Sequence, residues 1–199
     1  MKSNDYSRNV FINCPFDDEY KRFFYTIIFV VHDSGLIARC SLEIADSSEN
    51  RIDKITRIIS ECKYGINDLS RIELDSKNKL PRFNMPFELG LFIGCKKFGN
   101  DVQKRKSCLI IDKDKYLYQK FLSDISGFDI FYHSNKFQNL IVCIRNWLQA
   151  ETRSKSIPSA NLISKRYNKF LKKFPLIIKS LENEKNEKNY LYRFSKLCY

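Results

Sequence analysis

Five short runs rich in β-branched and aromatic residues recur along the first 133 residues, separated by longer amphipathic segments. The first of them, NVFINCPF, closes with a proline next to its last residue. Apolar runs of this length, bounded by polar or proline-containing segments, are typical of buried strands. The predicted strands are residues 9–16, 36–44, 64–70, 107–114 and 128–133.

Each run is followed by a segment with the spacing and the end residues of a helix. Within residues 50–63, apolar side chains recur every three or four positions, which is the period of one helical face. In the segment 84–99, Asn84 is the predicted N-cap, Pro86 lies in the first turn and Gly99 ends the helix. The predicted helices are residues 17–35, 50–63, 84–99, 115–127 and 136–150.

Five strand–helix repeats predict an α/β fold: a five-stranded parallel sheet with helices on both faces. The expected strand order is the flavodoxin-like order 2-1-3-4-5. This domain is predicted to span residues 1–150, and residues 151–199 form a basic helical C-terminal extension. The extension opens with a linker, 151–161, and its amphipathic segment 162–181 is expected to kink or end at Pro175.

Composition places the chain among globular proteins, because 43% of the residues are hydrophobic and 14% are aromatic. The sequence has no run of about 18 apolar residues and no signal-peptide layout, so a cytoplasmic location without membrane contact is expected. The seven cysteines lack a C-x-x-C pair, and the two histidines have no ligand spacing. We therefore predict reduced, structural cysteines and no metal site.

The net charge of +12 is concentrated in the C-terminal extension. Residues 151–199 contain 12 Lys and Arg and 4 Asp and Glu, a net charge of +8, which leaves +4 for the first 150 residues. A basic segment can follow phosphates or an anionic partner, and it can equally be the solvated exterior of a helix. The apolar side chains of the extension predict that it packs across the domain surface or against a second protomer.

Candidate binding residues lie where the expected sheet would bind a ligand. Ligands bind beyond the carboxyl ends of the strands where strand order reverses, which is here between the first and third strands. Asn13 and Asp17 follow the first strand, and Asp68 and Ser70 end the third. Glu88, in the predicted first turn of the next helix, faces the same point, although burying a charge in the apolar segment NMPFELGLFIG is costly.

Two stretches resemble a known family. The segment INDLSRIELDSKNKLPRFNMPFELGLFIGCKKFG is similar to the Asp-Leu-Ser/Thr, Asn-Met-Pro and Glu-Leu-Gly pattern of TIR-like and nucleoside 2-deoxyribosyltransferase-like domains. VFINCPFDDEY resembles the first strand and loop of TIR domains. The resemblance covers roughly residues 8–150 and implies a flavodoxin-like fold. It also implies that Glu88 is the catalytic carboxylate, acting at the anomeric carbon of a ribosyl or deoxyribosyl group as an N-glycosidic bond breaks.

The same resemblance implies an enzyme that uses NAD or a related nucleotide as substrate, without a cofactor, and that serves as an effector in prokaryotic anti-phage defence. It further implies a homo-oligomer and a partner protein of the defence system. Two alternatives stay open. One is a non-catalytic module that senses a nucleotide in the same pocket, and the other is a scaffold that binds nucleic acid through the basic tail.

Chemistry assigns roles to the other candidate residues. Loss of a base from ribose passes through an oxocarbenium-like centre that a nearby carboxylate stabilises. Asp68 is then the candidate for a general acid, or for holding ribose hydroxyls. Arg39 or Arg51 is expected to reach a phosphate, and Phe16 or Phe87 to stack on the base. The predicted substrate-binding set is completed by Asn13, Asp17, Ser70 and Asn84.

Each candidate also has a purely structural interpretation. Glu88 in a first helical turn would complement the helix dipole, and Asp17 would cap a helix. Asp68 and Ser70 would bond the local backbone in a turn, and Phe87 would belong to the core. The sequence contains no G-x-G-x-x-G and no G-K-[ST], which disfavours a dinucleotide-binding Rossmann site or a P-loop.

Overall fold

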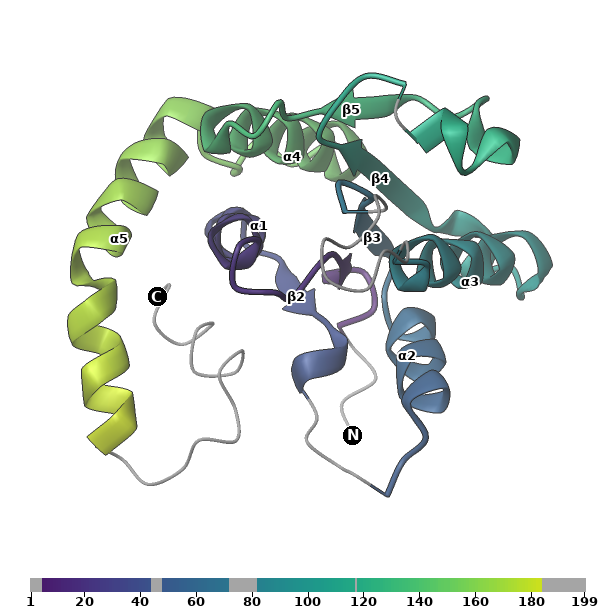
Figure 1. The fold of residues 1–199 in the computed structure, drawn as a ribbon, viewed down its shortest axis with the longest axis horizontal. Coiled ribbons are helices and arrows are strands. Elements are labelled where there is room, and N and C mark those ends of the chain that lie inside the picture. The colour runs from purple at the N-terminus through teal and green to yellow at the C-terminus, as the bar shows by residue number, and fades with distance from the viewer. Residues whose placement is uncertain (1–4, 44–47, 72–81, 117, 184–199) are drawn as a thin grey trace.

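The computed structural model describes residues 5–43, 48–71, 82–116 and 118–183, with side chains as far as Phe174. In this part of the chain, five strands alternate with helices (Figure 1). The strands are β1 (Asn9–Asn13), β2 (Ile37–Arg39), β3 (Tyr64–Asp68), β4 (Ser107–Asp112) and β5 (Ile130–Tyr132). The α-helices are α1 (Lys21–Asp33), α2 (Arg51–Ser60), α3 (Asn84–Phe98), α4 (Phe137–Thr152) and α5 (Ala160–Asn183).

The strands form one parallel sheet in the order β2-β1-β3-β4-β5. The register between β1 and β3 aligns Phe11 with Gly65 and Asn13 with Asn67. This is the flavodoxin-like arrangement expected from the strand–helix repeats, so the predicted fold class is confirmed. Strand order reverses between β1 and β3, and the carboxyl ends of these two strands therefore define the place to search for a site.

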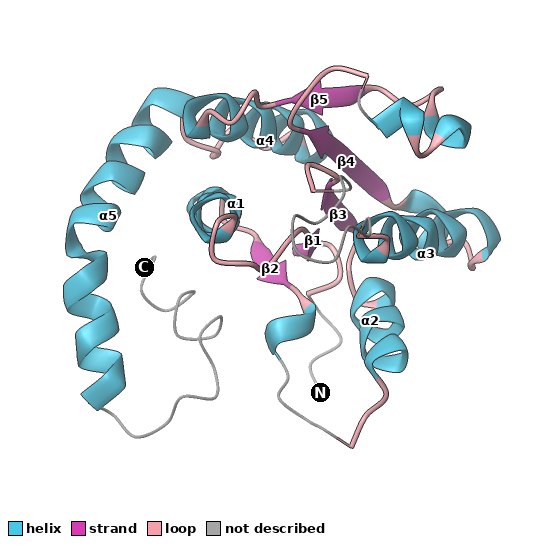
Figure 2. Cartoon of the chain, viewed as in Figure 1, coloured by secondary structure: helices cyan, strands magenta, loops and turns pink. Residues whose placement is uncertain are grey.

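Helices cover both faces of the sheet (Figure 2). One layer contains α1 and α4, with α5 packed on them, and the other contains α2 and α3. Side chains alternate along each strand, so consecutive residues enter different layers. Val10 and Ile12 accordingly belong to the core cluster with α1 and α4, whereas Phe11 packs against Phe92 of α3 with ring centroids 6.3 Å apart.

Gly65 of β3 fixes the position of α3 along the sheet. A Cβ atom added to Gly65 would stand 2.8 Å from a ring carbon of Phe92, closer than real contacts allow. The missing side chain lets the Phe92 ring lie directly on the strand. The register between α3 and β3 is therefore set at this contact.

Lys106, the residue before β4, holds the C-terminal end of α2. Its side chain is 1% exposed, and its ammonium group donates to the carbonyl oxygens of Ile59, at 2.6 Å, and of Cys62. The same ammonium lies 4.9 Å from the ring centroid of Phe92. Burial lowers the pKa of Lys106. These contacts tie the last turn of α2, and Cys62 just beyond it, to the start of β4.

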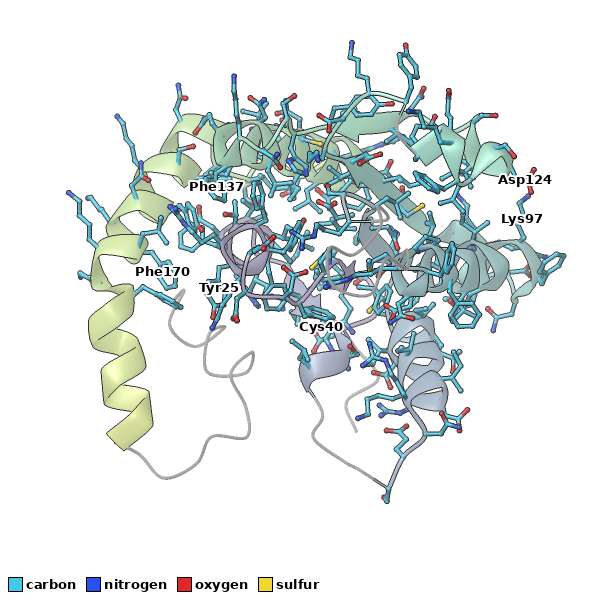
Figure 3. The ribbon with its side chains drawn as sticks, in the orientation of Figure 1. Tyr25, Cys40, Lys97, Asp124, Phe137 and Phe170 are labelled. Carbon is cyan, nitrogen blue, oxygen red and sulfur yellow. The ribbon has the colours of Figure 1, made fainter. Side chains whose placement is uncertain are left out.

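α5 packs through its apolar face on α1. The ring centroids of Phe170 and Phe29 are 5.3 Å apart, and those of Phe174 and Tyr25 are 4.9 Å apart. Figure 3 shows Phe170 directed from α5 toward α1. For the described side chains, the extension thus packs across the surface of the sheet domain, which is one of the two placements that its apolar pattern predicts.

The predicted helix at residues 115–127 is wrong. The described part of this segment forms two 3₁₀ turns, Tyr118–Lys120 and Ser123–Ile125. Tyr116 has a φ angle of 62°, which a right-handed helix does not allow. Tyr118 is buried in a cluster with Leu89 and Ile110, so packing against α3 and β4 overrides the local helical pattern.

Other boundaries also differ from the sequence prediction. β2 ends at Arg39, because a 3₁₀ turn after it brings Glu43 within 2.6 Å of the Arg39 guanidinium. Of the two outcomes expected at Pro175, a kink or an end of the helix, the end is wrong, because α5 continues to Asn183. Among the described residues, no helix is both long and apolar enough to cross a membrane.

Candidate active site

The contact between Phe92 and Gly65 places Glu88 beside the end of β3. In a strand–helix unit the helix runs back against the strand, so one turn toward the start of α3 is a step toward the carboxyl end of β3. One helical turn covers about 5.4 Å and two strand residues cover about 6.6 Å. Glu88, four residues before Phe92, therefore lies over Asn67, two residues beyond Gly65, on the same face of the sheet.

Glu88 is a buried carboxylate. It is 5% exposed, and its charged neighbour is Arg51 of α2, whose guanidinium nitrogen lies 3.6 Å from a carboxylate oxygen. The Arg51 side chain is 60% exposed. Burial raises the pKa of Glu88, and the charge of Arg51 offsets part of that rise. Keeping this carboxylate ionised is costly, and its pairing with Arg51 is weak. Glu88 is therefore a candidate for a catalytic role.

The start of α3 weakens the structural explanation of Glu88. The helix begins at Asn84 with Phe83 as its N-cap, so the prediction of Asn84 as N-cap is wrong. Glu88 is the fifth helical residue and lies beyond the first turn. Interactions with the helix dipole fall off within that turn. The dipole therefore explains little of why a carboxylate is buried at this position.

Two asparagines lie in the same layer. The Asn13 amide donates to Asn67 Oδ1 at 3.1 Å and to the Met85 carbonyl, one turn before Glu88, at 2.8 Å. Asn13 thereby ties the end of β1 to the start of α3. The Asn67 Nδ2 group is fully buried and has no hydrogen-bond partner among the described residues. A buried donor without a partner is costly, and it can be satisfied by a ligand acceptor.

Asp68 faces the opposite layer, because it is the strand neighbour of Asn67. It is fully buried and accepts hydrogen bonds from the Tyr20 hydroxyl and, at 2.8 Å, from the backbone N–H of Ser70. The local backbone bond expected for Asp68 in a turn is therefore present. No contact among the described residues joins Asp68 to Glu88, so the structure does not bring these two predicted catalytic carboxylates together.

His133, directly after β5, lies beside Asp68 and Ser70. Its Nε2 atom is 2.8 Å from Ser70 Oγ and 3.5 Å from Asp68 Oδ2. Its Nδ1 atom accepts the backbone N–H of Asn135 at 3.1 Å, so the neutral imidazole carries its proton on Nε2 and donates it to Ser70 or Asp68. This polarity is the reverse of a Ser-His-Asp triad, in which Nε2 accepts from the serine.

A strained turn holds His133 in this orientation. Ser134 and Asn135 have φ angles of 49° and 54°, and the Lys136 N–H donates to the His133 carbonyl at 2.9 Å. Two consecutive left-handed residues closed by this bond form a type I′ turn, which is uncommon without glycine. The imidazole also packs on Phe23 of α1, with ring centroids 5.0 Å apart.

The remaining predicted binding residues are spread over other contacts. Asp17 accepts from Arg82 at 2.7 Å and lies 3.7 Å from Arg71. Its Oδ1 also accepts the N–H of Tyr20. Because α1 begins at Lys21 with Tyr20 as its N-cap and without a side-chain cap bond, the predicted capping role of Asp17 is wrong. Arg39 is engaged by Glu43 and by Glu61, at 2.6 and 2.9 Å.

The aromatic candidates behave differently from each other. Phe16 packs edge-to-face on Phe24, with ring centroids 5.2 Å apart, and so belongs to the core. Phe87 is 56% exposed, which contradicts its interpretation as a core residue. Asn84 is exposed one turn away, at the start of α3. Near Glu88, the exposed aromatic candidate is therefore Phe87.

No family model, curated protein or solved structure matches this chain. The resemblance to TIR-like and deoxyribosyltransferase-like domains therefore stays a hypothesis carried by the sequence motifs. Among the described residues, no three His, Cys, Asp or Glu side chains gather as a metal site.

Four polar residues at the carboxyl edge were missed by sequence reasoning. Asp112 is fully buried and its Oδ1 accepts the Lys113 N–H at 2.6 Å. Like Asp68, it is the last residue of its strand. Most of these residues could have been found from their position in the sequence, because they end a strand, directly follow one or directly precede a helix. The four are Tyr20, Asn67, Asp112 and His133.

Two buried groups with opposite pKa shifts predict compensating pH effects on stability. Burial lowers the pKa of His32 to about 4, from 6.5, and raises the pKa of Asp112 to about 6, from 3.8. As pH falls from 6.5 to 4, His32 becomes protonated in the unfolded chain but stays neutral in the folded protein. This difference lowers the free energy of unfolding by about 3 kcal/mol. Over nearly the same range, folded Asp112 gains a proton before the unfolded chain does, which restores about 3 kcal/mol.

Single substitutions should separate the two effects in urea unfolding measured from pH 7 to pH 4. Relative to wild type, His32→Leu should gain stability as pH falls, and Asp112→Asn should lose it. Asp114→Asn, at an exposed position two residues further on, should give a curve parallel to wild type. Parallel curves for all three variants would show that neither buried group titrates as described.

Proposed function

We propose that this protein cleaves the N-glycosidic bond of a nucleotide, with NAD as the first substrate to test and Glu88 as the carboxylate that acts at the anomeric carbon. The observation that carries the proposal is the burial of Glu88 at the strand-order reversal, with a single exposed arginine as its ion-pair partner among the described residues. The motifs around Glu88, which resemble those of TIR-like and deoxyribosyltransferase-like domains, support the same assignment.

The reaction needs one carboxylate if the leaving group departs as a neutral molecule. In NAD the nicotinamide ring is a cation, so the bond from its nitrogen to C1′ breaks with both electrons going to nitrogen, and no proton has to be supplied. The positive charge passes to C1′ and the ring oxygen, where the Glu88 carboxylate stabilises it or forms an ester. Water then adds to C1′ and releases a proton.

The neighbouring side chains supply recognition in this proposal. The unpartnered Asn67 amide can donate to a ribose hydroxyl, and Asn13 holds Asn67 in place. Arg51, mostly exposed, can leave Glu88 and pair with a phosphate of the nucleotide. Phe87, more than half exposed, can stack on a base.

Asp68 has no proton-transfer step in this proposal. Its carboxylate is occupied by Tyr20, by Ser70 and by the nearby imidazole of His133, on the sheet face opposite Glu88. This network fixes the end of β3, and with it the position of Asn67. A substrate with a cationic leaving group suits a site with one free carboxylate, which is why NAD comes before neutral nucleosides.

The direct test is chromatography of purified protein incubated with NAD and with a panel of nucleotides and deoxynucleotides. We expect free nicotinamide to accumulate, and the rate per protomer to rise with protein concentration if the site is completed by a homo-oligomer. If no base is released at any concentration while nucleotides still raise the melting temperature, the protein is a nucleotide sensor. The role as a prokaryotic defence effector, with its partner protein, rests on the family resemblance alone.

A further inference from the structure

The outward face of α5 is held in a fixed direction. Ile163, Tyr167 and Phe170 are buried against the core, and the Tyr167 hydroxyl lies 2.8 Å from Thr26 Oγ of α1. Arg166 adds an ion pair with Asp33 at the end of α1, at 3.0 Å. Because these contacts determine which side of α5 faces α1, they also determine which side chains face solvent.

That solvent face carries a row of lysines. Lys165, Lys169, Lys172 and Lys173, called the lysine row below, are all exposed. In the described part of the chain, none of their ammonium groups forms an ion pair with a carboxylate. The sequence offers little acidic compensation either, since no Asp or Glu occurs from residue 152 to residue 181. Figure 3 shows nitrogen-tipped side chains extending from α5 on the side away from Phe170.

We propose that the lysine row binds the phosphate backbone of a nucleic acid, independently of the site at Glu88. At about 1.5 Å per residue, Lys165 and Lys172 are separated by roughly 10 Å along the helix. One strand of a duplex carries a charge about every 3.4 Å along its axis, so the row faces about three phosphates. A rigid row of ammonium groups releases the counterions of those phosphates without ordering a flexible chain.

The same geometry argues against a membrane surface. An amphipathic helix binds a bilayer by inserting its apolar face. In the part of α5 whose side chains are described, which ends at Phe174, the apolar face is covered by α1. The row also lacks exposed aromatic side chains in the described part of α5, so it is suited to phosphates rather than to stacking on bases. Binding should therefore be independent of sequence and strongly dependent on salt.

Fluorescence anisotropy of the full chain with a short labelled duplex of mixed sequence tests the proposal. Between about 50 and 200 mM salt, the logarithm of the binding constant should fall against the logarithm of salt concentration with a slope of about −3. Replacing the four lysines of the row by glutamine, which has a similar helix propensity, should weaken binding at the lowest salt by at least about tenfold and flatten the slope.

The matched control changes the charge by the same amount elsewhere. It replaces four exposed lysines on other elements by glutamine and should keep both the affinity and the slope; the four are Lys96, Lys97, Lys115 and Lys120. If the control variant weakens binding to the duplex equally, the effect comes from net charge alone and the proposal is wrong. Absence of binding by wild type at the lowest salt would also overturn it, as would binding to phosphatidylserine vesicles but not to the duplex.

Discussion

Glu88→Gln is expected to lower the release of nicotinamide from NAD by at least about a hundredfold, because it removes the negative charge that faces the developing cation. The same change should leave the protein as stable as wild type or more stable. Burial raises the pKa of Glu88, so the folded state bears a cost for holding this group ionised at neutral pH, and a neutral amide of the same shape removes that cost. Turnover by chromatography and melting temperature should be measured on the same preparations.

The matched control for this prediction is Glu61→Gln. Glu61 is a half-exposed carboxylate that also pairs with an arginine, Arg39, at 2.9 Å. Its replacement should cost some stability and leave turnover intact. If Glu88→Gln loses stability and turnover together, the carboxylate is a structural group and the proposed catalytic role is wrong. Unchanged turnover would lead to the same conclusion.

Lys106→Met, an apolar replacement of similar shape, is expected to lower the free energy of unfolding by about 2–3 kcal/mol. The methionine keeps the apolar stem but leaves the Cys62 carbonyl without its donor and removes the cation from the Phe92 ring. Urea unfolding monitored by circular dichroism measures the change. Because Lys106 lies at the start of β4, away from the carboxyl edge, folded variant protein should keep its activity.

Lys104→Met provides the comparison for Lys106. Lys104 is 58% exposed and pairs with Asp101 at 3.1 Å, so its loss should change stability by no more than about 0.5 kcal/mol. Equal unfolding midpoints for Lys106→Met and wild type would mean that the buried ammonium contributes nothing to holding the end of α2. A similar loss for both variants would point instead to an effect of net charge.

The sheet could be predicted from sequence because the strands are short apolar runs bounded by polar or proline-containing segments, and because the helices between them have apolar residues at helical spacing. The segment 115–127 shows where this logic fails. Its pattern is helical, but burial of Tyr118 beside Ile110 selects short 3₁₀ turns, and that preference comes from residues distant in the sequence. Long-range packing of this kind is absent from any local window.

The candidate site was predicted in part, for a similar reason. Glu88 and Asn13 were found because they lie at predictable ends of elements. Side chains alternate between the two faces of a strand, so a shift of one position in the predicted β3 moves Asp68 to the face of Glu88. The sequence leaves an uncertainty of one position, and the separation of the two carboxylates could therefore not be predicted. The importance of His133 depends on contacts with Asp68 and Ser70, more than 60 residues earlier in the chain, and its turn has no glycine to signal it.

The end of β3 has a mechanical consequence. Asn67 and Asp68 share one peptide group, yet the first contacts Asn13 in the layer of α3 and the second contacts Tyr20 and His133 in the layer of α1 and α4. The peptide group between them is planar and stiff, so the contacts on both faces of the sheet hold the same short piece of backbone. The end of β3 is therefore anchored in both helix layers at once, on one side beside Glu88 and on the other at the start of α1 and at the turn that precedes α4.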